Sequence, residues 1–429
     1  IDSKLESGKI TDANISVRVT DEFMDRVACD GDYYQTFPID LQIPYCGKDY
    51  ELISKLEYNN LLKIDGGYIK KVKAKYLWDK IIKNAWKSAE PGVLFWDSII
   101  RESPADCYGE EWQTKSTNPC GEIPLCPYDS CRLLSINLYS YVVNAFEKDA
   151  YFDFDKFKED VIIAQRLMDD LVDLELEKIN KILEKIENDP EDDSIKSVEK
   201  ELWEKIFYMT QAGRRTGLGV TGEGDMLAAL GFTYGSDIAI DMSERVHREL
   251  AVSSYTSSII MAEERGSFIR WNYELEKGNP FINRVYNELE DYTYKVMYNN
   301  HGRRNISNLT IAPTGTTSLM TQTTSGIEPC FAIFYKRRRR TIDKSKASFI
   351  DEHGEMFEEY NVFHHKFEEW YDKNWFKTDV KLFDLDYKKS LENYTDEELK
   401  ILITKSPYHN ATSVDINWTN KVKLQGKVQ

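Results

Sequence analysis

Apolar and polar residues follow two different periods along this chain of 429 residues. Residues 15–20 alternate between apolar and polar side chains, which predicts a strand. Residues 21–27 change to helical spacing, and Thr20 or Asp21 is suited to cap that helix. The pattern predicts another helix over residues 76–87 and a short strand or turn over residues 93–96.

The longest helical pattern runs from residue 154 to residue 187. The sequence Asn-Asp-Pro-Glu-Asp-Asp at residues 188–193 breaks it, and a second helix is predicted from about residue 194 to residue 211. Both segments are rich in charge. We therefore predict a solvent-exposed helical hairpin over about residues 154–212.

Shorter patterns follow in the second half of the chain. Helices are predicted from residue 226, over residues 242–265, and over the aromatic-rich residues 355–373. Residues 309–313 predict a buried strand. The alternation of strands and helices favours the α/β class.

The last residues, 417–429, predict an amphipathic helix without a stop signal. Val422, Leu424 and Val428 would lie along one side of it, and we expect this side to need a partner. Because the sequence also begins at Ile1 rather than at Met, both ends look cut.

Charge and hydropathy narrow the possible partners. The formal net charge is −17, so the chain is a poor candidate for binding a nucleic-acid polymer, although a local pocket can still bind a small anion. No apolar run reaches the roughly 20 residues that span a membrane, and no signal peptide opens the sequence. We expect a cytoplasmic protein without a membrane partner.

The cysteines suggest reactive thiols rather than a metal site. The chain has seven, namely Cys29, Cys46, Cys107, Cys120, Cys126, Cys131 and Cys330. An odd number without a CxxC pair indicates neither a disulfide framework nor a zinc ribbon. We expect reduced thiols and no metal.

Residues 104–135 are rich in Pro, Gly, Cys, Asn and Ser and keep no period, which predicts a loop. Within it stand Asn118, Pro119, Cys120, Gly121 and Glu122. In an extended loop the amide, the thiol and the carboxylate would point the same way. Such a set suits radical abstraction from a carbon that bears a hydroxyl. The same residues also fit a buried cysteine in a Pro/Gly turn.

Two further motifs carry possible chemistry. Cys131 follows Cys120 by 11 residues, and a second thiol near a radical site could act as a reductant. Residues 312–318, Ala-Pro-Thr-Gly-Thr-Thr-Ser, follow an apolar strand and open a helix. Hydroxyls and N–H groups there would bind an anion, and ordinary helix capping explains the same residues.

Three other patterns are misleading. Residues 217–222 match G-x-G-x-x-G, but a helix rather than a strand is predicted before them, so we expect no dinucleotide site. Arg337 to Arg340 is interpreted as a solvated face. The pair His364-His365 has no acidic or cysteine neighbour at metal-ligand spacing and is interpreted as structural.

Four stretches in register resemble one family. They are residues 14–24, residues 117–125 with 128–131, residues 214–222 and residues 309–329. Together they are similar to the class II, adenosylcobalamin-dependent ribonucleotide reductases, and the resemblance covers nearly the whole chain. It implies a ten-stranded α/β barrel with a central finger loop at about residues 104–135. Residues 1–429 would then form a single catalytic barrel-domain fragment.

The resemblance also implies roles for the site. Cys120 would be the thiyl radical that takes the 3′-hydrogen of the ribose, Glu122 would take the 3′-hydroxyl proton, and Asn118 would hydrogen-bond the sugar hydroxyls. Cys131 would be one of two thiols that reduce the 2′ position. The substrate would also be held by Pro119 and Gly121 and, at its phosphates, by Pro313, Thr314, Gly315, Thr316 and Thr317.

The implied partners are a ribonucleoside di- or triphosphate, adenosylcobalamin and a thioredoxin-like reductant. The sequence departs from the family by lacking the second reducing cysteine, the allosteric loops and the terminal cysteine pair, and it shows no separate cobalamin motif. Two hypotheses follow. The chain is a catalytic piece that acts with complementary fragments or subunits, or it is an inactive remnant or assembly subunit that keeps the fold.

Overall fold

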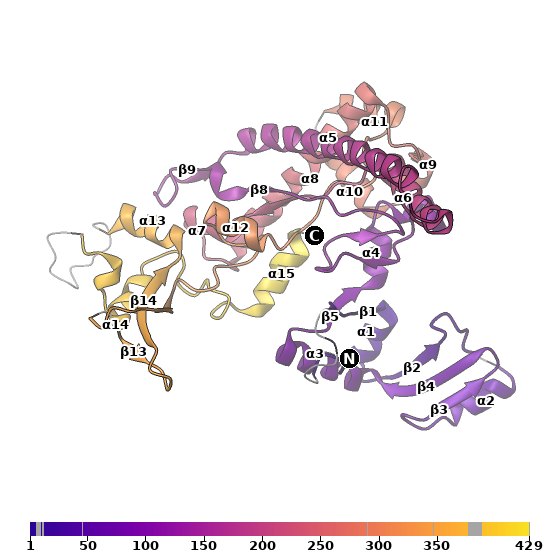
Figure 1. Ribbon diagram of the computed structural model, residues 1–429, viewed down its shortest axis with the longest axis horizontal. Coiled ribbons are helices and arrows are strands. Elements are labelled where there is room, and N and C mark those ends of the chain that lie inside the picture. The colour runs from indigo at the N-terminus through magenta and orange to yellow at the C-terminus, as the bar shows by residue number, and fades with distance from the viewer. Residues whose placement is uncertain are drawn as a thin grey trace. The chain divides into compact units, whose positions relative to one another are not determined.

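The computed structural model describes residues 1–5, 10, 13–44, 46–289, 291–345, 347–375 and 388–428. The chain packs as two compact units. Unit 1 comprises Ile1–Pro127 and Gly278–Phe281, and unit 2 comprises Tyr128–Lys277 and Ile282–Gln429. Helices and strands mix in both units, as predicted (Figure 1). That the units belong to one barrel domain stays a prediction.

Unit 1 holds two small sheets and, further along the chain, the short hairpin of β6 (Ser116–Thr117) and β7 (Pro124–Leu125). One pairs β1 (Ser16–Val19) with β5 (Gly92–Phe95) in parallel, and these strands confirm the predictions for residues 15–20 and 93–96. The other is antiparallel, in the order β2, β4, β3, with the bounds β2 (Asp32–Phe37), β3 (Leu61–Ile64) and β4 (Gly67–Lys73). The helices of the unit are α1 (Asp21–Ala28), α2 (Lys48–Ser54), α3 (Ala74–Ser88) and α4 (Trp96–Glu102).

The beginning of α1 shows how the sequence sets these elements. The hydroxyl of Thr20 accepts a hydrogen bond of 3.1 Å from the backbone N–H of Phe23, so Thr20 is the cap that the sequence predicted. Phe23 is then buried against Val19 and Ala74. The cap and this contact together fix the direction in which α1 leaves β1.

In unit 2 a short parallel sheet forms the centre. Strand β8 (Leu134–Asn137) pairs with β11 (Leu218–Thr221), and Leu309 adds a single parallel bridge to Leu218 on the other side. The buried strand predicted at residues 309–313 is thus reduced to one bridge. A Cβ atom at Gly219 would lie 2.5 Å from the carbonyl oxygen of Thr310, so this glycine permits the close approach of the two backbones.

Two long helices precede β11 in the chain, as predicted. They are α5 (Phe154–Glu187) and α6 (Asp193–Gly213), and α5 is the longest described helix in Figure 1. One side of α5 packs against α8 (Asp237–Arg265) and buries Val161, Met168 and Val172. The expectation of an exposed hairpin therefore holds for only part of its surface.

Helix α8 begins five residues before the predicted start, because Ser236 accepts a hydrogen bond from the N–H of Ala239 and caps it. Helix α7 (Glu223–Ala229) likewise begins before the predicted residue 226.

The last helix, α15 (Trp418–Val428), packs against α8. Leu424 is 1 % exposed, and Val428 packs on the same core, whereas Val422 is 59 % exposed. The expectation that this apolar side needs a partner is thus wrong for Leu424, which finds one within the chain. Gln429 lies outside the described residues.

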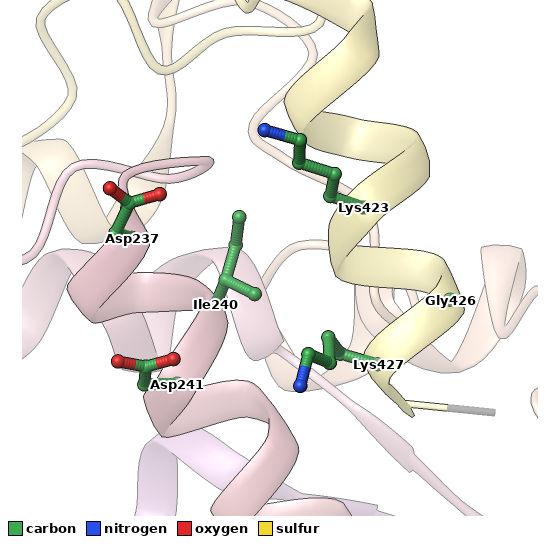
Figure 2. A pocket seen from close by; sticks show the side chains of 6 residues that line it. All are labelled: Asp237, Ile240, Asp241, Lys423, Gly426 and Lys427. Carbon is green, nitrogen blue, oxygen red and sulfur yellow. The ribbon is translucent and has the colours of Figure 1, made fainter.

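A hollow of about 450 Å³ remains beside this helix contact. Figure 2 shows Asp237, Ile240 and Asp241 of α8 facing Lys423, Gly426 and Lys427 of α15 across it. Lys427 also pairs with Glu244 of α8 at 2.9 Å. Because opposite charges on two packed helices line this hollow, we interpret it as part of the contact between the helices rather than as a ligand site.

A three-stranded antiparallel sheet follows, in the order β12, β14, β13. It corrects the helix predicted over residues 355–373, since that segment is β14 (Met356–Phe363) followed by α13 (His365–Asn374). The arginines of β12 (Phe334–Arg340) are exposed, as predicted. Arg338 and Arg339 pair with Glu359 and Glu358 on the neighbouring strand. Such cross-strand pairs help to explain why this aromatic-rich segment forms a strand rather than a helix.

The remaining elements flank these cores. They are β6 (Ser116–Thr117), β7 (Pro124–Leu125), β9 (Val142–Val143), β10 (Tyr151–Phe152), β13 (Phe349–Ile350), α9 (Tyr273–Glu276), α10 (Pro280–Glu288), α11 (Tyr292–His301), α12 (Gly315–Thr321) and α14 (Asp396–Ile403), with single 3₁₀ turns at Asp106–Tyr108, Glu110–Trp112, Leu138–Tyr141 and Leu391–Asn393.

Candidate active site

The predicted radical cysteine lies at the tip of a hairpin in unit 1. Strands β6 and β7 pair antiparallel, and residues 118–123 connect them. The N–H of Gly121 donates to the carbonyl of Asn118 at 3.0 Å, which closes a tight turn, and Gly121 has φ +87°. Cys120 is exposed at this turn. The alternative, a buried cysteine in a Pro/Gly turn, is therefore wrong, because Cys120 is not buried.

This turn replaces the extended geometry that was predicted for residues 118–122. Residues 118–122 are not extended, so alternation along a strand does not bring Asn118, Cys120 and Glu122 to one side. The side-chain oxygen of Asn118 instead accepts a hydrogen bond of 2.9 Å from the N–H of Ile123. Its NH₂ group is the end that can donate to a substrate hydroxyl. Glu122 is half-buried beside it.

Buried residues lie in and next to this hairpin in the sequence. Ile123 and Cys126 are 3 % and 4 % exposed, and Trp112, which precedes β6, is 1 % exposed. Cys126 therefore acts as a small apolar residue. The result is a short hairpin with a buried side and an exposed thiol at its turn.

Cys131 belongs to unit 2, and its neighbours anchor it. Arg132 is buried and donates to the carbonyl of Arg215 at 2.7 Å and to the hydroxyl of Thr210 at 3.0 Å. Arg215 in turn donates to a carboxylate oxygen of Asp129 at 2.5 Å. Arginine–carboxylate contacts in a buried site are strongly directional, so residues 129–132 are fixed against the start of β11.

The predicted phosphate segment, residues 313–317, lies where β11 and its neighbour end. Thr316 and Thr317 are exposed in the first turn of α12. Thr314 has a different role. It is only 9 % exposed, and its hydroxyl lies 2.9 Å from the hydroxyl of Thr221. The N–H of Gly326 also donates to Thr314 at 2.7 Å. Thr314 thus supports the segment, and Thr316 and Thr317 face outwards from it.

An acidic cluster in unit 2 resembles a metal site but is already neutralised. Asp169, Asp170 and Asp173 have carboxylate oxygens close together. Burial would raise the pKa of Asp169, yet hydrogen bonds and charge from Arg214 and Arg304 lower it. Arg214 contacts Asp169 and Asp173, both at 2.7 Å. The arginines supply the positive charge that a metal would bring.

Two buried clusters were not predicted from the sequence. One joins Asp225, His364 and Tyr408 through hydrogen bonds of 2.7 and 2.8 Å. The other brings His247 within 3.6 Å of Glu223. The available signal was Glu223-Gly-Asp225 itself, since two acidic residues directly after a buried strand need partners. His364 has its partner 139 residues away, which spacing along the sequence cannot reveal.

Comparison with known proteins identifies the class. The family model described as "Ribonucleotide reductase, barrel domain" matches residues 1–414. The chain therefore belongs to the ribonucleotide reductase family, as the four motifs indicated.

Named relatives narrow this further. The chain is 35 % identical over 332 residues to the vitamin B12-dependent ribonucleoside-diphosphate reductase of Thermoplasma acidophilum, which covers 77 % of this chain and 33 % of that protein. It is 32 % identical over 272 residues to the enzyme of the same name from Mycobacterium tuberculosis, over 63 % of this chain and 32 % of that protein.

The alpha subunit of the ribonucleoside-diphosphate reductase of Chlamydia pneumoniae is 27 % identical over 358 residues, which is 76 % of this chain and 30 % of that protein. The chain thus spans about a third of the length of the curated relatives it matches. Among the described residues, no helix is both long and apolar enough to cross a membrane.

Proposed function

We propose that this chain carries the catalytic centre of a vitamin B12-dependent ribonucleotide reductase and reduces ribonucleotides by thiyl-radical chemistry together with complementary fragments or subunits. The observation that carries the proposal is the exposed Cys120 at a hairpin turn, within a chain that belongs to the family. The relatives' names supply the substrate class, a ribonucleoside diphosphate, and the cofactor class.

The roles of the residues follow the family motif. The Cys120 thiyl radical takes the 3′-hydrogen of the ribose, and Glu122 accepts the proton of the 3′-hydroxyl. The NH₂ group of Asn118 donates to a sugar hydroxyl, since its oxygen is bound to the N–H of Ile123. Cys131 supplies one of the two hydrogens and electrons that reduce the 2′ position, and a second thiol from another segment supplies the other. A thioredoxin-like reductant restores the pair.

The phosphates are assigned to residues 313–317. The support for this is the exposure of Thr316 and Thr317 beside backbone N–H groups, on a segment that Thr314 fixes from below. Hydroxyl and N–H donors suit phosphate oxygens. We also propose that both units belong to a ten-stranded barrel, of which β8, β11 and Leu309 form adjoining parallel members.

When bound, adenosylcobalamin would supply the radical chemistry, and the exposed Cys120 thiol is the group of this chain that would receive the radical. Two hollows among the described residues, of about 450 and 560 Å³, are lined mainly by carboxylates and amines on helices of unit 2, and this lining does not fit a corrin ring.

The decisive experiment replaces Cys120 by Ser in the native reductase that contains this chain. Serine is close in size, but its O–H bond is too strong for hydrogen relay, so we expect reduction with adenosylcobalamin to be lost while nucleotide binding stays nearly intact. Cys29→Ser is the matched control, because Cys29 is also an exposed thiol of unit 1. Activity of more than a few per cent in the Cys120→Ser protein would refute the assignment.

A second candidate function is an inactive subunit that keeps the fold. Its prediction differs at the same residues, since Cys120→Ser and Glu122→Gln would then leave the activity of the assembly unchanged. For a positioned acid–base group we instead expect Glu122→Gln to cost about 10²- to 10⁴-fold.

A further inference from the structure

Asp225 joins distant parts of unit 2. It lies on α7 and is completely buried. One carboxylate oxygen accepts hydrogen bonds from Nε2 of His364 at 2.7 Å and from the hydroxyl of Tyr408 at 2.8 Å. The other accepts the backbone N–H of Thr324 at 2.7 Å. Helix α7, the end of β14, the loop before α15 and the loop after α12 therefore meet at one carboxylate.

The charge of this carboxylate is balanced within the cluster. Burial by itself would lower the pKa of His364, but the negative charge and hydrogen bond of Asp225, with a contribution from Cys330, raise it to about 10. His364 is therefore an imidazolium at neutral pH and supplies the countercharge that a buried carboxylate needs. The charge of His364 therefore does not change across the physiological range.

Thr324 connects Asp225 to the predicted phosphate segment through further hydrogen bonds. Its carbonyl accepts the N–H of Gly222 at 2.9 Å and the hydroxyl of Thr221 at 3.2 Å. The same Thr221 hydroxyl lies 2.9 Å from that of Thr314, to which Gly326 also donates at 2.7 Å. Two routes of short hydrogen bonds thus connect the loop at residues 324–326 to Thr314.

We propose that Asp225, held by His364 and Tyr408, is a positioning residue for the substrate phosphates. It sets the place of the loop at residues 324–326, and this loop sets the place of Thr314 beneath residues 313–317. The inference rests on the proposed function, because it needs those residues to bind phosphate. It goes beyond it by assigning a role to three residues that make no contact with the substrate in that proposal.

A purely structural role would predict the same burial and the same hydrogen bonds, so the test must separate stability from binding. Tyr408→Phe removes one donor to Asp225 and keeps the ring. Tyr371→Phe is a matched control, since Tyr371 and Tyr408 are 2 % and 1 % exposed and belong to the same apolar core. The Tyr371 hydroxyl bonds the carbonyl of Lys389 at 2.7 Å and not Asp225.

Binding of inorganic pyrophosphate and of ADP is measured by calorimetry on the native reductase, beside thermal unfolding. Both Phe variants should lower the unfolding temperature by similar amounts. Only Tyr408→Phe should weaken pyrophosphate and ADP binding, by about two- to tenfold, the range for one lost hydrogen bond. In turnover it should raise KM more than it lowers kcat. Equal affinities in the two variants would overturn the inference.

Two further variants test the positioning role and the phosphate segment separately. Asp225→Asn should weaken pyrophosphate binding further, because an amide cannot accept from all three donors, and combining it with Tyr408→Phe should add little. Full additivity would count against the inference. Thr316→Asp tests the phosphate segment itself. If it leaves pyrophosphate affinity unchanged, the phosphate site and the inference both fall. If it weakens binding while Tyr408→Phe does not, only the positioning role falls.

Discussion

Nε2 of His247 lies 3.6 Å from a carboxylate oxygen of Glu223, and Glu223 is completely buried. Nδ1 of His247 is 2.9 Å from the carbonyl oxygen of Ser243, so the ring carries its proton on Nδ1 and donates it there. The Nε2 of a neutral ring and a carboxylate are both acceptors. Burial therefore disfavours the ionised form of Glu223.

This relationship predicts a pH dependence of stability. Burial is the main cause that raises the pKa of Glu223, against smaller opposing effects of His247 and Ser243, while Glu328 adds to the rise. A pKa raised on folding contributes stability that is complete below the unfolded value and is lost as the pH rises through the folded value. The wild-type free energy of unfolding should fall as the pH rises above the ordinary glutamate range.

Glu223→Gln should remove most of this fall, because its side chain stays neutral. Urea unfolding at a series of pH values measures it. Glu244→Gln is the control with the opposite sign, since its hydrogen bond from Lys427 lowers the pKa of Glu244, and any contribution of Glu244 is lost towards acid pH. If Glu223→Gln and wild type followed parallel curves, burial would not raise the pKa of Glu223 on folding.

Local patterns were enough to predict many elements but not the long-range ones. Thr20 caps the helix that it was predicted to cap, and residues 188–193 separate α5 from α6 as the sequence indicated. Such features depend on neighbours within one or two turns. The strand β14 was mistaken for a helix, because its extended form depends on pairing with the arginines of β12, which helical periodicity does not register.

The candidate site divides in the same way. The motif around Cys120 located an exposed turn, but its hydrogen bond between Gly121 and Asn118 replaces the extended geometry that alternation predicts. The partners of Asp225 could not be predicted, since Thr324, His364 and Tyr408 lie 99, 139 and 183 residues away. Only the folded chain brings such groups together.

A charge placed on the predicted phosphate segment should weaken nucleotide binding. Thr316 is exposed in the first turn of α12, so Thr316→Asp puts a carboxylate where the phosphates are expected without disturbing a buried contact. Thr419→Asp makes the same change in the first turn of α15, at another exposed position of unit 2. Calorimetry with ADP should show loss of affinity for the first protein alone. Equal affinities would remove residues 313–317 from the proposed site.

Breaking a buried ion pair should strongly destabilise unit 2. Glu276 and Arg303 are both completely buried, with 2.8 Å between Nε of Arg303 and a carboxylate oxygen of Glu276. The other carboxylate oxygen accepts the hydroxyl of Tyr298 at 2.6 Å. Glu276→Gln leaves the guanidinium without a countercharge, so unfolding in denaturant should show a loss of about 3–5 kcal/mol.

The neighbouring Glu274 provides the comparison. Its carboxylate pairs with Lys277 at the surface, where both side chains are more than half exposed. Water and salt screen such a pair, so it contributes little to the free energy of unfolding. Glu274→Gln should therefore be nearly neutral. Similar losses in the two variants would show that the Glu276–Arg303 pair is not buried as described.

The packing of α15 on α8 leads to the last prediction. Leu424 is 1 % exposed and belongs to the core that contains Val246 and Leu250 of α8, whereas Val422 is 59 % exposed. Truncating a buried leucine removes its transfer free energy and leaves a cavity, which costs about 2–5 kcal/mol. Leu424→Ala should therefore lower the free energy of unfolding by this amount. Val422→Ala, two residues earlier on the same helix, should change it by less than about 0.5 kcal/mol.

If α15 docked only onto another chain, both variants would leave the unfolding of this chain unchanged and would instead weaken its association with that partner. Denaturant unfolding and sedimentation of the two variants separate these results, because a loss of stability that is independent of protein concentration places the contact of Leu424 within the chain.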